Sequence, residues 1–222
     1  MTKAERRAAQ QAARATTLAD RLDSLLALRG DERVLDVGCG AGAFAYAVAP
    51  AVREVVAVDS DPSMVEVSRR NAPANVHVEQ ADGERLPFGA AEFDLAATLR
   101  TLHHTEHPEQ LVAELVRVTR PGGTVLVVDQ LAPPGDEEAL ALNEFERVRD
   151  ASTWRVLPER ELRELLARAG LTVERAEIVR EARDLEAYLD LAGCEGADRA
   201  RAARLAPPGY QATVGWFVLL HP

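Results

Sequence analysis

The stretch VLDVGCGAGAFA, residues 34–45, combines an apolar run with three glycines at alternate positions, Gly38, Gly40 and Gly42. Glycine tolerates positive φ and allows a ligand to approach the backbone closely, which a Cβ would block. A helix that follows such a turn adds its N-terminal dipole to the same place. The stretch therefore predicts a buried strand, a ligand-binding turn and a helix, in that order.

Apolar runs typical of strands recur along the chain and alternate with helical stretches. Strands are predicted at residues 33–37, 54–59, 75–80, 92–99, 124–129, 171–181 and 211–221. Helices are predicted between them, among others at residues 61–72, at 108–120 with Pro121-Gly122-Gly123 as the stop, at 136–149 and over 185–205. This alternation indicates right-handed βαβ units and a parallel sheet covered on both faces. The expected fold class is α/β, with a doubly wound, mostly parallel seven-stranded sheet.

The 222 residues are expected to form a single domain, since the chain shows no internal repeat and no low-complexity linker. Within it we expect a helical arm (1–30), a cofactor-binding core (31–130), a substrate-side lid insertion (131–170) and C-terminal strands with a helix (171–222).

Charge and composition exclude several classes of function. The net charge is −10, and the arginines are scattered along helices, so nucleic acid is not an expected partner. No apolar run approaches the roughly 18 residues of a membrane helix, and the N-terminus lacks the apolar core of a secretory signal. The two cysteines have no zinc-finger spacing. We expect a reduced, cytoplasmic enzyme with no membrane partner, as a monomer or homodimer.

The glycine turn alone leaves the cofactor open. Gly38-x-Gly40-x-x-Ala43 also satisfies a relaxed dinucleotide fingerprint, and Asp59 has the ribose-binding position in either case. Asp36 separates the two interpretations, because an anionic residue two places before the first glycine suits a cationic ligand better than a pyrophosphate. S-adenosylmethionine has no phosphate and carries an ammonium and a sulfonium.

Several co-ordered segments resemble the class I S-adenosylmethionine-dependent methyltransferases. These segments are VLDVGCGAG, VVAVDSDPSMVEVSRR, QADGERLPFGAAEFDLA, LRTLHHTEHP and ELVRVTRPGGTVLVVD, and they cover roughly residues 32–130. The likeness extends to the small-molecule branch that includes the ubiquinone and menaquinone C-methyltransferases. The resemblance implies a Rossmann-like fold with an antiparallel last strand, and S-adenosylmethionine as cofactor with S-adenosylhomocysteine as product.

The same resemblance implies roles for individual residues. The turn at Gly38, Cys39, Gly40 and Gly42 would pack on the methionine and ribose part of the cofactor, and Asp36 would hold its ammonium. The other implied cofactor contacts are Asp59 at the ribose, Ser60 and Met64 at the adenine, Asp82 with Gly83 at the adenine amino group, and Leu99 and Arg100 at the methionine end.

Each of these residues also has a purely structural interpretation. Asp36 could be a structural acid of the turn, and Asp59 could cap the helix that begins at Pro62. Asp82 before Gly83 could be an ordinary turn residue, and a methionine such as Met64 is more often part of a core.

His103 and His104 are the candidate catalytic residues, because an imidazole titrates near neutrality and could serve as a general base. Asp129, at the end of the fifth strand, is another candidate. His103 and His107 have a helical spacing that could suggest a metal, but no zinc-ligand pattern accompanies them, and no metal is expected.

The acceptor is expected to be a small molecule that is methylated on O, N or C. Its contacts should come from the segments added to the common core, where the aromatic and cationic groups are Phe145, Arg149, Trp154, Arg155 and Tyr188. Two other functions stay open: an NAD(P)-dependent oxidoreductase, and a non-catalytic protein that binds S-adenosylmethionine.

Overall fold

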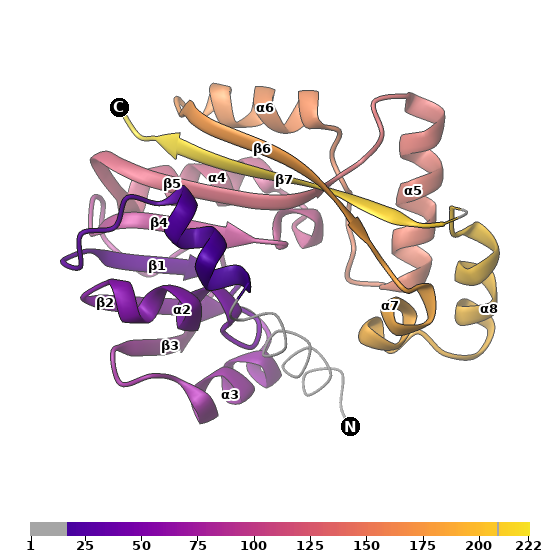
Figure 1. Ribbon diagram of the computed structural model, residues 1–222, viewed down its shortest axis with the longest axis horizontal. Coiled ribbons are helices and arrows are strands. Elements are labelled where there is room, and N and C mark those ends of the chain that lie inside the picture. The colour runs from indigo at the N-terminus through magenta and orange to yellow at the C-terminus, as the bar shows by residue number, and fades with distance from the viewer. Residues whose placement is uncertain (1–16, 208) are drawn as a thin grey trace.

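A seven-stranded sheet runs through the molecule (Figure 1). The computed structural model describes residues 17–207 and 209–222. The strand order is β3-β2-β1-β4-β5-β7-β6. The strands are β1 (Arg33–Val37), β2 (Glu54–Asp59), β3 (Val76–Gln80), β4 (Phe93–Leu99), β5 (Thr119–Leu131), β6 (Thr172–Ala182) and β7 (Gln211–Leu220).

Strands β1 to β5 pair in parallel, whereas β7 runs antiparallel to both β5 and β6. The predicted mostly parallel sheet with an antiparallel last strand is therefore confirmed. From β1 the chain proceeds to β2 and β3 on one side and then returns to β4 and β5 on the other, so the strand order reverses between β1 and β4. Open α/β sheets bind their ligands at such a point, at the carboxyl ends of the strands.

Helices cover both faces of the sheet. The helical residues 17–25, α2 (Ala43–Val48) and α3 (Pro62–Asn71) pack on one face, where Leu22, Phe44 and Val65 join a common core. Helices α4 (Pro108–Val118) and α6 (Glu159–Arg168) pack on the other face, through Leu111 and Leu162. The strands between these layers are nearly continuously apolar because both of their faces are buried.

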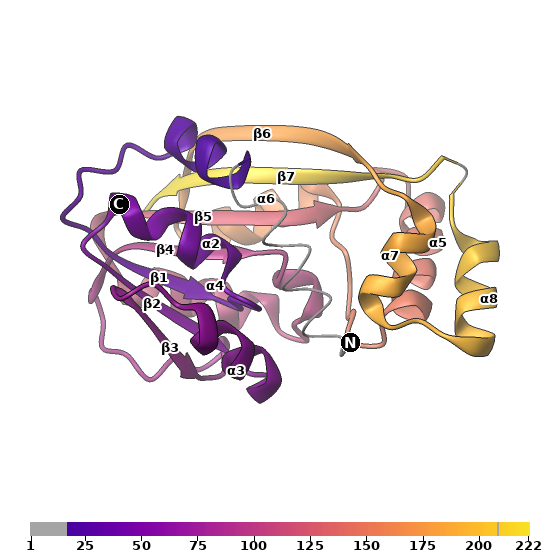
Figure 2. The same ribbon diagram turned by 60° about the horizontal axis from the view of Figure 1, so that its bottom comes forward.

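Three further helices gather beyond the carboxyl ends of β5 and β6, as Figures 1 and 2 both show. They are α5 (Asp136–Arg149), α7 (Leu185–Ala192) and α8 (Gly196–Leu205). The predicted substrate-side insertion at 131–170 thus divides, since α5 lies in this group and α6 packs on the sheet. Residues 1–16 of the predicted arm lie outside the described residues.

Two local predictions were wrong. The helix before Pro121 ends at Val118, and β5 begins at Thr119. The Pro-Gly-Gly segment belongs to this strand: Gly122 N–H donates to the His221 carbonyl (2.7 Å), and His221 N–H donates to the Gly123 carbonyl (3.0 Å). The predicted continuous helix over 185–205 is interrupted at Gly193, whose φ of +69° ends α7.

Within the described residues, no helix combines the length and apolar character that crossing a membrane requires.

Candidate functional site

A cavity of about 790 Å³ opens at the carboxyl edge of the parallel strands, and we call it the ligand cavity. The strand ends that form its floor are those of β1, β2, β4 and β5, and its far wall is formed by α7, β7 and the helical residues 17–25. Loops that leave different strands converge there because the strands are parallel.

The glycine turn forms one wall of the cavity through a close backbone approach. Gly38 has φ +74°, and a Cβ at this position would lie 2.3 Å from the side chain of Thr101. The N–H groups of Gly38 and Cys39 both donate to the carbonyl of Val58, at 2.8 and 2.9 Å. The turn therefore joins β1 to β2, and a side chain at Gly38 would separate it from the end of β4.

Asp36 is a buried carboxylate beneath this turn. Its Oδ2 accepts from the backbone N–H of Ala45 at 3.2 Å. Burial raises the pKa of Asp36 to about 7, the nearby charge of Asp59 adds to the rise, and the bond from Ala45 opposes it. A buried anion without a cationic partner on the protein is costly, and a bound ammonium would offset that cost.

Asp59 is positioned by two backbone groups at the end of β2. Its Oδ2 accepts from Gly40 N–H (2.8 Å) and its Oδ1 accepts from Asp61 N–H (2.9 Å). The cap of α3 is Asp61, which accepts from Ser63 N–H at 2.8 Å. The alternative role of Asp59 as a helix cap is therefore wrong, and the carboxylate is held at the cavity.

Asp82 lines the cavity and also shapes a turn. Its Oδ1 accepts from Glu84 N–H at 2.9 Å, as expected of an aspartate that initiates a turn. The structural and the binding interpretation are compatible for this residue.

His103 forms a buried pair with Asp129 on the opposite side of the cavity floor. The ring Nδ1 lies 2.5 Å from Asp129 Oδ1, and His103 N–H donates to Oδ2 at 2.9 Å. Burial alone would raise the pKa of Asp129, but the charge of His103 and the hydrogen bonds from His103 and Gln130 hold it below its usual range. An ionised Asp129 accepts from Nδ1–H, which leaves Nε2 of a neutral ring as the basic nitrogen.

His104, by contrast, is tied to the loop after α5. Its Nδ1 lies 3.0 Å from the carbonyl oxygen of Ser152, to which it must donate, since a carbonyl only accepts. His104 lines the rim of the ligand cavity, whereas the neighbouring His103 is buried.

A buried polar network closes the far side of the cavity. Glu146 accepts from Arg149 Nε (2.8 Å), the Tyr210 hydroxyl (2.6 Å) and Gln130 Nε2 (2.7 Å). The hydroxyl of Tyr188 donates to the same carboxylate at 3.0 Å, and the Arg149 guanidinium lies 4.0 Å from the centre of the Tyr188 ring. These contacts hold α5, α7 and β5 together at the cavity.

Comparison with known proteins agrees with this geometry. The family described as a methyltransferase domain matches residues 35–127, which carry the glycine turn, the acids and the histidines. Residues 35–127 thus match a methyltransferase domain, as the resemblance to the class I S-adenosylmethionine-dependent methyltransferases led us to expect. The cofactor of this class is S-adenosylmethionine, and the buried Asp36 and the glycine cradle fit its cationic amino acid part.

Two curated methyltransferases and one crystal structure illustrate the relationship. The 27-O-demethylrifamycin SV methyltransferase of Amycolatopsis mediterranei is 35% identical over 173 residues, which is 74% of this chain and 62% of that protein. The ubiquinone/menaquinone C-methyltransferase of Stutzerimonas stutzeri is 32% identical over 139 residues, 59% of this chain and 51% of that protein. A Bacillus halodurans protein, described as a putative methyltransferase, superposes with a TM-score of 0.85 at 26% identity, covering 92% of this chain and 98% of its own.

The chain therefore spans about half to three fifths of the length of these two curated relatives.

The structure brings nearly all the predicted site residues to one cavity. Those that line it are Asp36, Gly38, Cys39, Gly40, Asp59, Ser60, Met64, Asp82, Gly83, Leu99, Arg100, His103 and His104. Gly42 is not among the described lining residues. It begins α2 with φ +92°, and a Cβ there would lie 2.5 Å from the ring of Tyr46, so the packing of α2 requires this glycine.

Only some of the residues predicted to contact the acceptor line the cavity. Arg149 and Tyr188 line the cavity. Phe145 is fully buried in the core, Trp154 is 52% exposed, and Arg155 pairs with Glu161 at the surface. The aromatic and cationic composition of the segment indicated the right region, but it could not say which side chains turn inward.

Several lining residues escaped the sequence interpretation. One of them is Glu181, whose two carboxylate oxygens accept from the guanidinium of the predicted Arg100 (2.7 and 2.9 Å), which joins the end of β4 to β6. Gln130, Trp216 and Arg21 also line the cavity. The period-two pattern of β7 places Trp216 on one face of the sheet, but nothing in the sequence says that this face borders the cavity.

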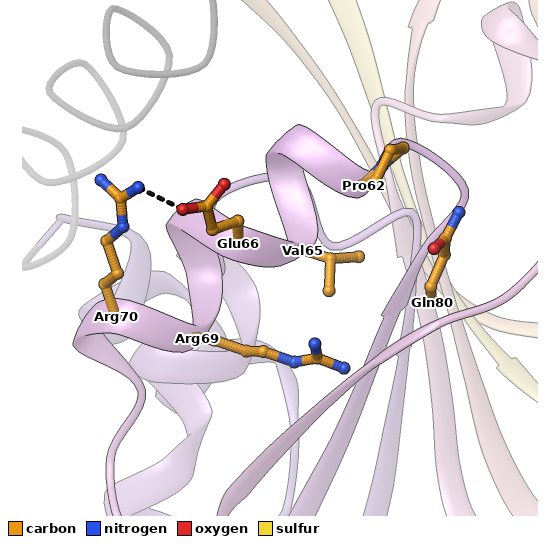
Figure 3. Close-up of a pocket in the computed structure, with 6 residues that line it drawn as sticks. All are labelled: Pro62, Val65, Glu66, Arg69, Arg70 and Gln80. Atoms are coloured by element: carbon orange, nitrogen blue, oxygen red, sulfur yellow. Dashed lines mark hydrogen bonds and ion pairs between the residues drawn. The ribbon is translucent and has the colours of Figure 1, made fainter.

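A second hollow of about 430 Å³ lies between α3 and the end of β3 (Figure 3). Its polar side chains bind protein groups: Arg70 pairs with Glu66, Arg69 donates to the Val78 carbonyl (2.9 Å), and Gln80 donates to Ser60 (3.2 Å). It carries no pair suited to acid–base chemistry and is separate from the ligand cavity. In the described part of the chain, no three His, Cys, Asp or Glu side chains gather as a metal-binding group would.

The raised pKa of Asp36 predicts a pH-dependent stability. Because Asp36 keeps its proton to about pH 7 in the folded state and loses it near pH 4 when unfolded, its contribution is greatest below about pH 4 and is lost as pH rises to about 7. The expected loss is about 1.4 kcal/mol for each pH unit of that window. Urea unfolding of the ligand-free protein and of Asp36→Asn at pH 5, 6 and 7 measures it. Equal pH slopes for the two proteins would contradict the assignment.

Proposed function

We propose that the protein transfers a methyl group from S-adenosylmethionine to an O, N or C atom of a small organic acceptor. One observation carries the proposal: a single cavity contains the glycine turn with its three carboxylates and also the buried His103–Asp129 pair. A site for a cationic nucleoside derivative and a candidate base thus share one cavity.

Each of the cofactor-side residues would bind a different part of S-adenosylmethionine. Asp36 would bind the ammonium, and Asp59, whose carboxylate is held at the cavity by Gly40 N–H and Asp61 N–H, would accept from the ribose hydroxyls. Met64 and Asp82 line the part of the cavity beyond Asp59, where the adenine would lie. The buried carboxylate of Asp36 beneath the glycine turn disfavours the pyrophosphate that a dinucleotide would place there.

Bound S-adenosylmethionine supplies an electrophilic methyl group on a positively charged sulfur. The charge disappears on transfer, so the protein needs no oxyanion hole, and its main contribution is to hold the acceptor in line. Where the acceptor atom arrives protonated, His103 takes that proton at Nε2 and Asp129 stabilises the resulting imidazolium. His104 acts as a positioning residue, through its bond to the loop at Ser152.

The acceptor class follows from the relatives and the cavity together. Two relatives are a methyltransferase of 27-O-demethylrifamycin SV and a C-methyltransferase of ubiquinone/menaquinone biosynthesis. Rifamycin SV, ubiquinone and menaquinone are all organic small molecules, and the far wall of the cavity combines aromatic, apolar and polar side chains, with Tyr188, Leu191 and Gln130 as examples. We infer a small organic acceptor rather than a polymer.

Calorimetry tests the proposed function directly. S-adenosylmethionine and S-adenosylhomocysteine are expected to bind, and NAD is not. Asp59→Asn should lower the affinity for S-adenosylhomocysteine by about ten- to a hundredfold, since a hydrogen bond to a charged group is worth about 1.5–3 kcal/mol. Asp198→Asn, an exposed position on α8, should bind as the wild type does.

The outcomes separate the rival functions. Binding of NAD in place of S-adenosylhomocysteine would support an oxidoreductase and refute the proposal. Binding of S-adenosylmethionine without turnover on any acceptor in a broad product screen would support the non-catalytic alternative.

A further inference from the structure

Two hydrogen-bond donors without partners lie side by side on the far wall of the ligand cavity. Across residues 17–207 and 209–222, the buried side-chain nitrogens and oxygens that lack a partner are Arg21 Nε, Thr153 Oγ1 and Trp216 Nε1. The Arg21 guanidinium lies 4.3 Å from the centre of the Trp216 ring, and both residues line the cavity. Unpaired buried donors are rare in folded proteins, so two in contact call for an explanation.

This wall belongs to the acceptor half of the cavity. Trp216 lies on β7, and β4 and β5 separate β7 from β1, where Asp36 lies. With neighbouring strands about 4.8 Å apart, the indole is on the order of 14 Å from the β1 end of the floor. The cofactor acids lie on β1, on β2 and after β3, in the opposite direction from β7.

The local charge favours an anion. Arg21 pairs with Glu177 at 2.8 Å, but Glu177 also accepts from Arg175 at 2.6 Å. Two guanidiniums therefore share one carboxylate, and the group retains one positive charge. Trp216 is only 6% exposed and the Arg21 side chain is 28% exposed, so the Arg21 charge is partly shielded from water on the side of the indole.

We propose that Arg21 Nε–H and Trp216 Nε1–H form a subsite for an anionic oxygen of the acceptor, a carboxylate or a phenolate. The two donors are rigidly framed, because the helix that carries Arg21 is tied to β6 by its pair with Glu177 and by Arg175, which donates to the Ser24 carbonyl (2.7 Å). The apolar neighbours Leu18 and Leu191 line the same cavity and suit the carbon skeleton of such an acceptor. The assignment of this subsite to the acceptor rests on the proposed function, whereas binding of an oxyanion at the two donors does not.

Indole N–H resonances provide a direct readout with an internal control. The chain has two tryptophans, and Trp154 is half exposed and outside the cavity lining, so a ¹⁵N-labelled protein gives one reporter signal and one reference signal. Trp154→Phe assigns them. Benzoate, added with S-adenosylhomocysteine at saturation, is expected to shift the Trp216 signal saturably and to leave the Trp154 signal in place. Benzamide, the neutral probe of the same shape, should produce at least tenfold weaker binding.

Charge-matched variants test the role of Arg21. Arg21→Gln should lower the affinity for benzoate about tenfold or more. Arg147→Gln removes the same charge from an exposed position on α5 and should not change benzoate affinity. Arg21→Lys, which keeps a cation opposite Glu177, provides a folded alternative if the glutamine variant is unstable, and it should also weaken benzoate because Nε–H is lost.

The outcomes are distinguishable. Equal binding of benzoate and benzamide, or equal losses in Arg21→Gln and Arg147→Gln, would overturn the subsite. Competition between benzoate and S-adenosylhomocysteine would assign the donors to the cofactor carboxylate and overturn the acceptor assignment. Failure of S-adenosylhomocysteine to bind would refute the proposed function, whereas the Trp216 shift with benzoate alone would still report on the oxyanion site.

Discussion

His103→Gln is expected to lower kcat by about 100-fold or more on an acceptor whose nucleophile arrives protonated, because a positioned general base contributes about 10²–10⁴-fold. Glutamine removes the basic nitrogen while retaining a polar side chain near Asp129, whose carboxylate is 2.5 Å from the His103 ring. The rate is measured as S-adenosylhomocysteine formed with the first acceptor that a product screen identifies. The affinity for S-adenosylmethionine should stay within about twofold.

Asp129→Asn and His104→Ala distinguish a base from a structural histidine. An asparagine at 129 is uncharged and no longer offers a carboxylate to the Nδ1–H of His103, so kcat should fall as well, with little change in KM. His104→Ala removes a bond to the Ser152 carbonyl and should cost less than about tenfold. Turnover of His103→Gln at the wild-type rate, or a larger loss in His104→Ala, would remove His103 from the mechanism.

The predictions for the cofactor half of the site rest on local information in the sequence. The strand, the glycine turn and the acids at Asp36 and Asp59 follow one another within 26 residues, and the parallel sheet places the strand ends together. The resemblance to a known family then ordered the later segments. The structure places these acids at one cavity.

The acceptor half was less predictable because it is assembled from distant parts of the chain. Arg21, Gln130, Glu181 and Trp216 come from four segments, and their side chains meet only because β7 inserts antiparallel between β5 and β6. Composition indicated aromatic and cationic residues near α5, yet Phe145 and Trp154 face the core and the surface. Which way a side chain turns depends on tertiary packing, and no local pattern records that.

Glu146 is the clearest example of what the pattern of α5 conceals. Within the helix it resembles the exposed Glu144 two residues earlier, and both are acidic residues in a charged, amphipathic segment. Glu146 is fully buried, whereas Glu144 lies at the surface and pairs with Arg201 at 2.8 Å. Burial alone would raise the pKa of Glu146, but the charge of Arg149 and the bonds from Tyr210, Gln130 and Arg149 hold it below its usual range, so it is ionised at neutral pH.

Glu146→Gln is therefore expected to destabilise the protein by about 3 kcal/mol or more, since removal of one partner of a buried ion pair leaves an uncompensated charge. Arg149 would keep only Asp150, at 3.9 Å, as an anionic partner, and its side chain is 5% exposed. Urea unfolding at pH 7 measures the change, with Glu144→Gln as the matched control. The control should stay within about 0.5 kcal/mol, because surface ion pairs contribute little.

The double variant Glu146→Leu with Arg149→Leu separates charge from packing. If the loss in Glu146→Gln comes from the unpaired guanidinium, removal of both charges should recover part of it, as replacement of buried ion pairs by apolar residues often does. Three polar partners of Glu146, the hydroxyls of Tyr188 and Tyr210 and the amide of Gln130, would remain without their shared acceptor, so recovery should be incomplete. A double variant that is less stable than Glu146→Gln would show that the hydrogen bonds from these three neutral donors, and not the ion pair, stabilise the far wall of the cavity.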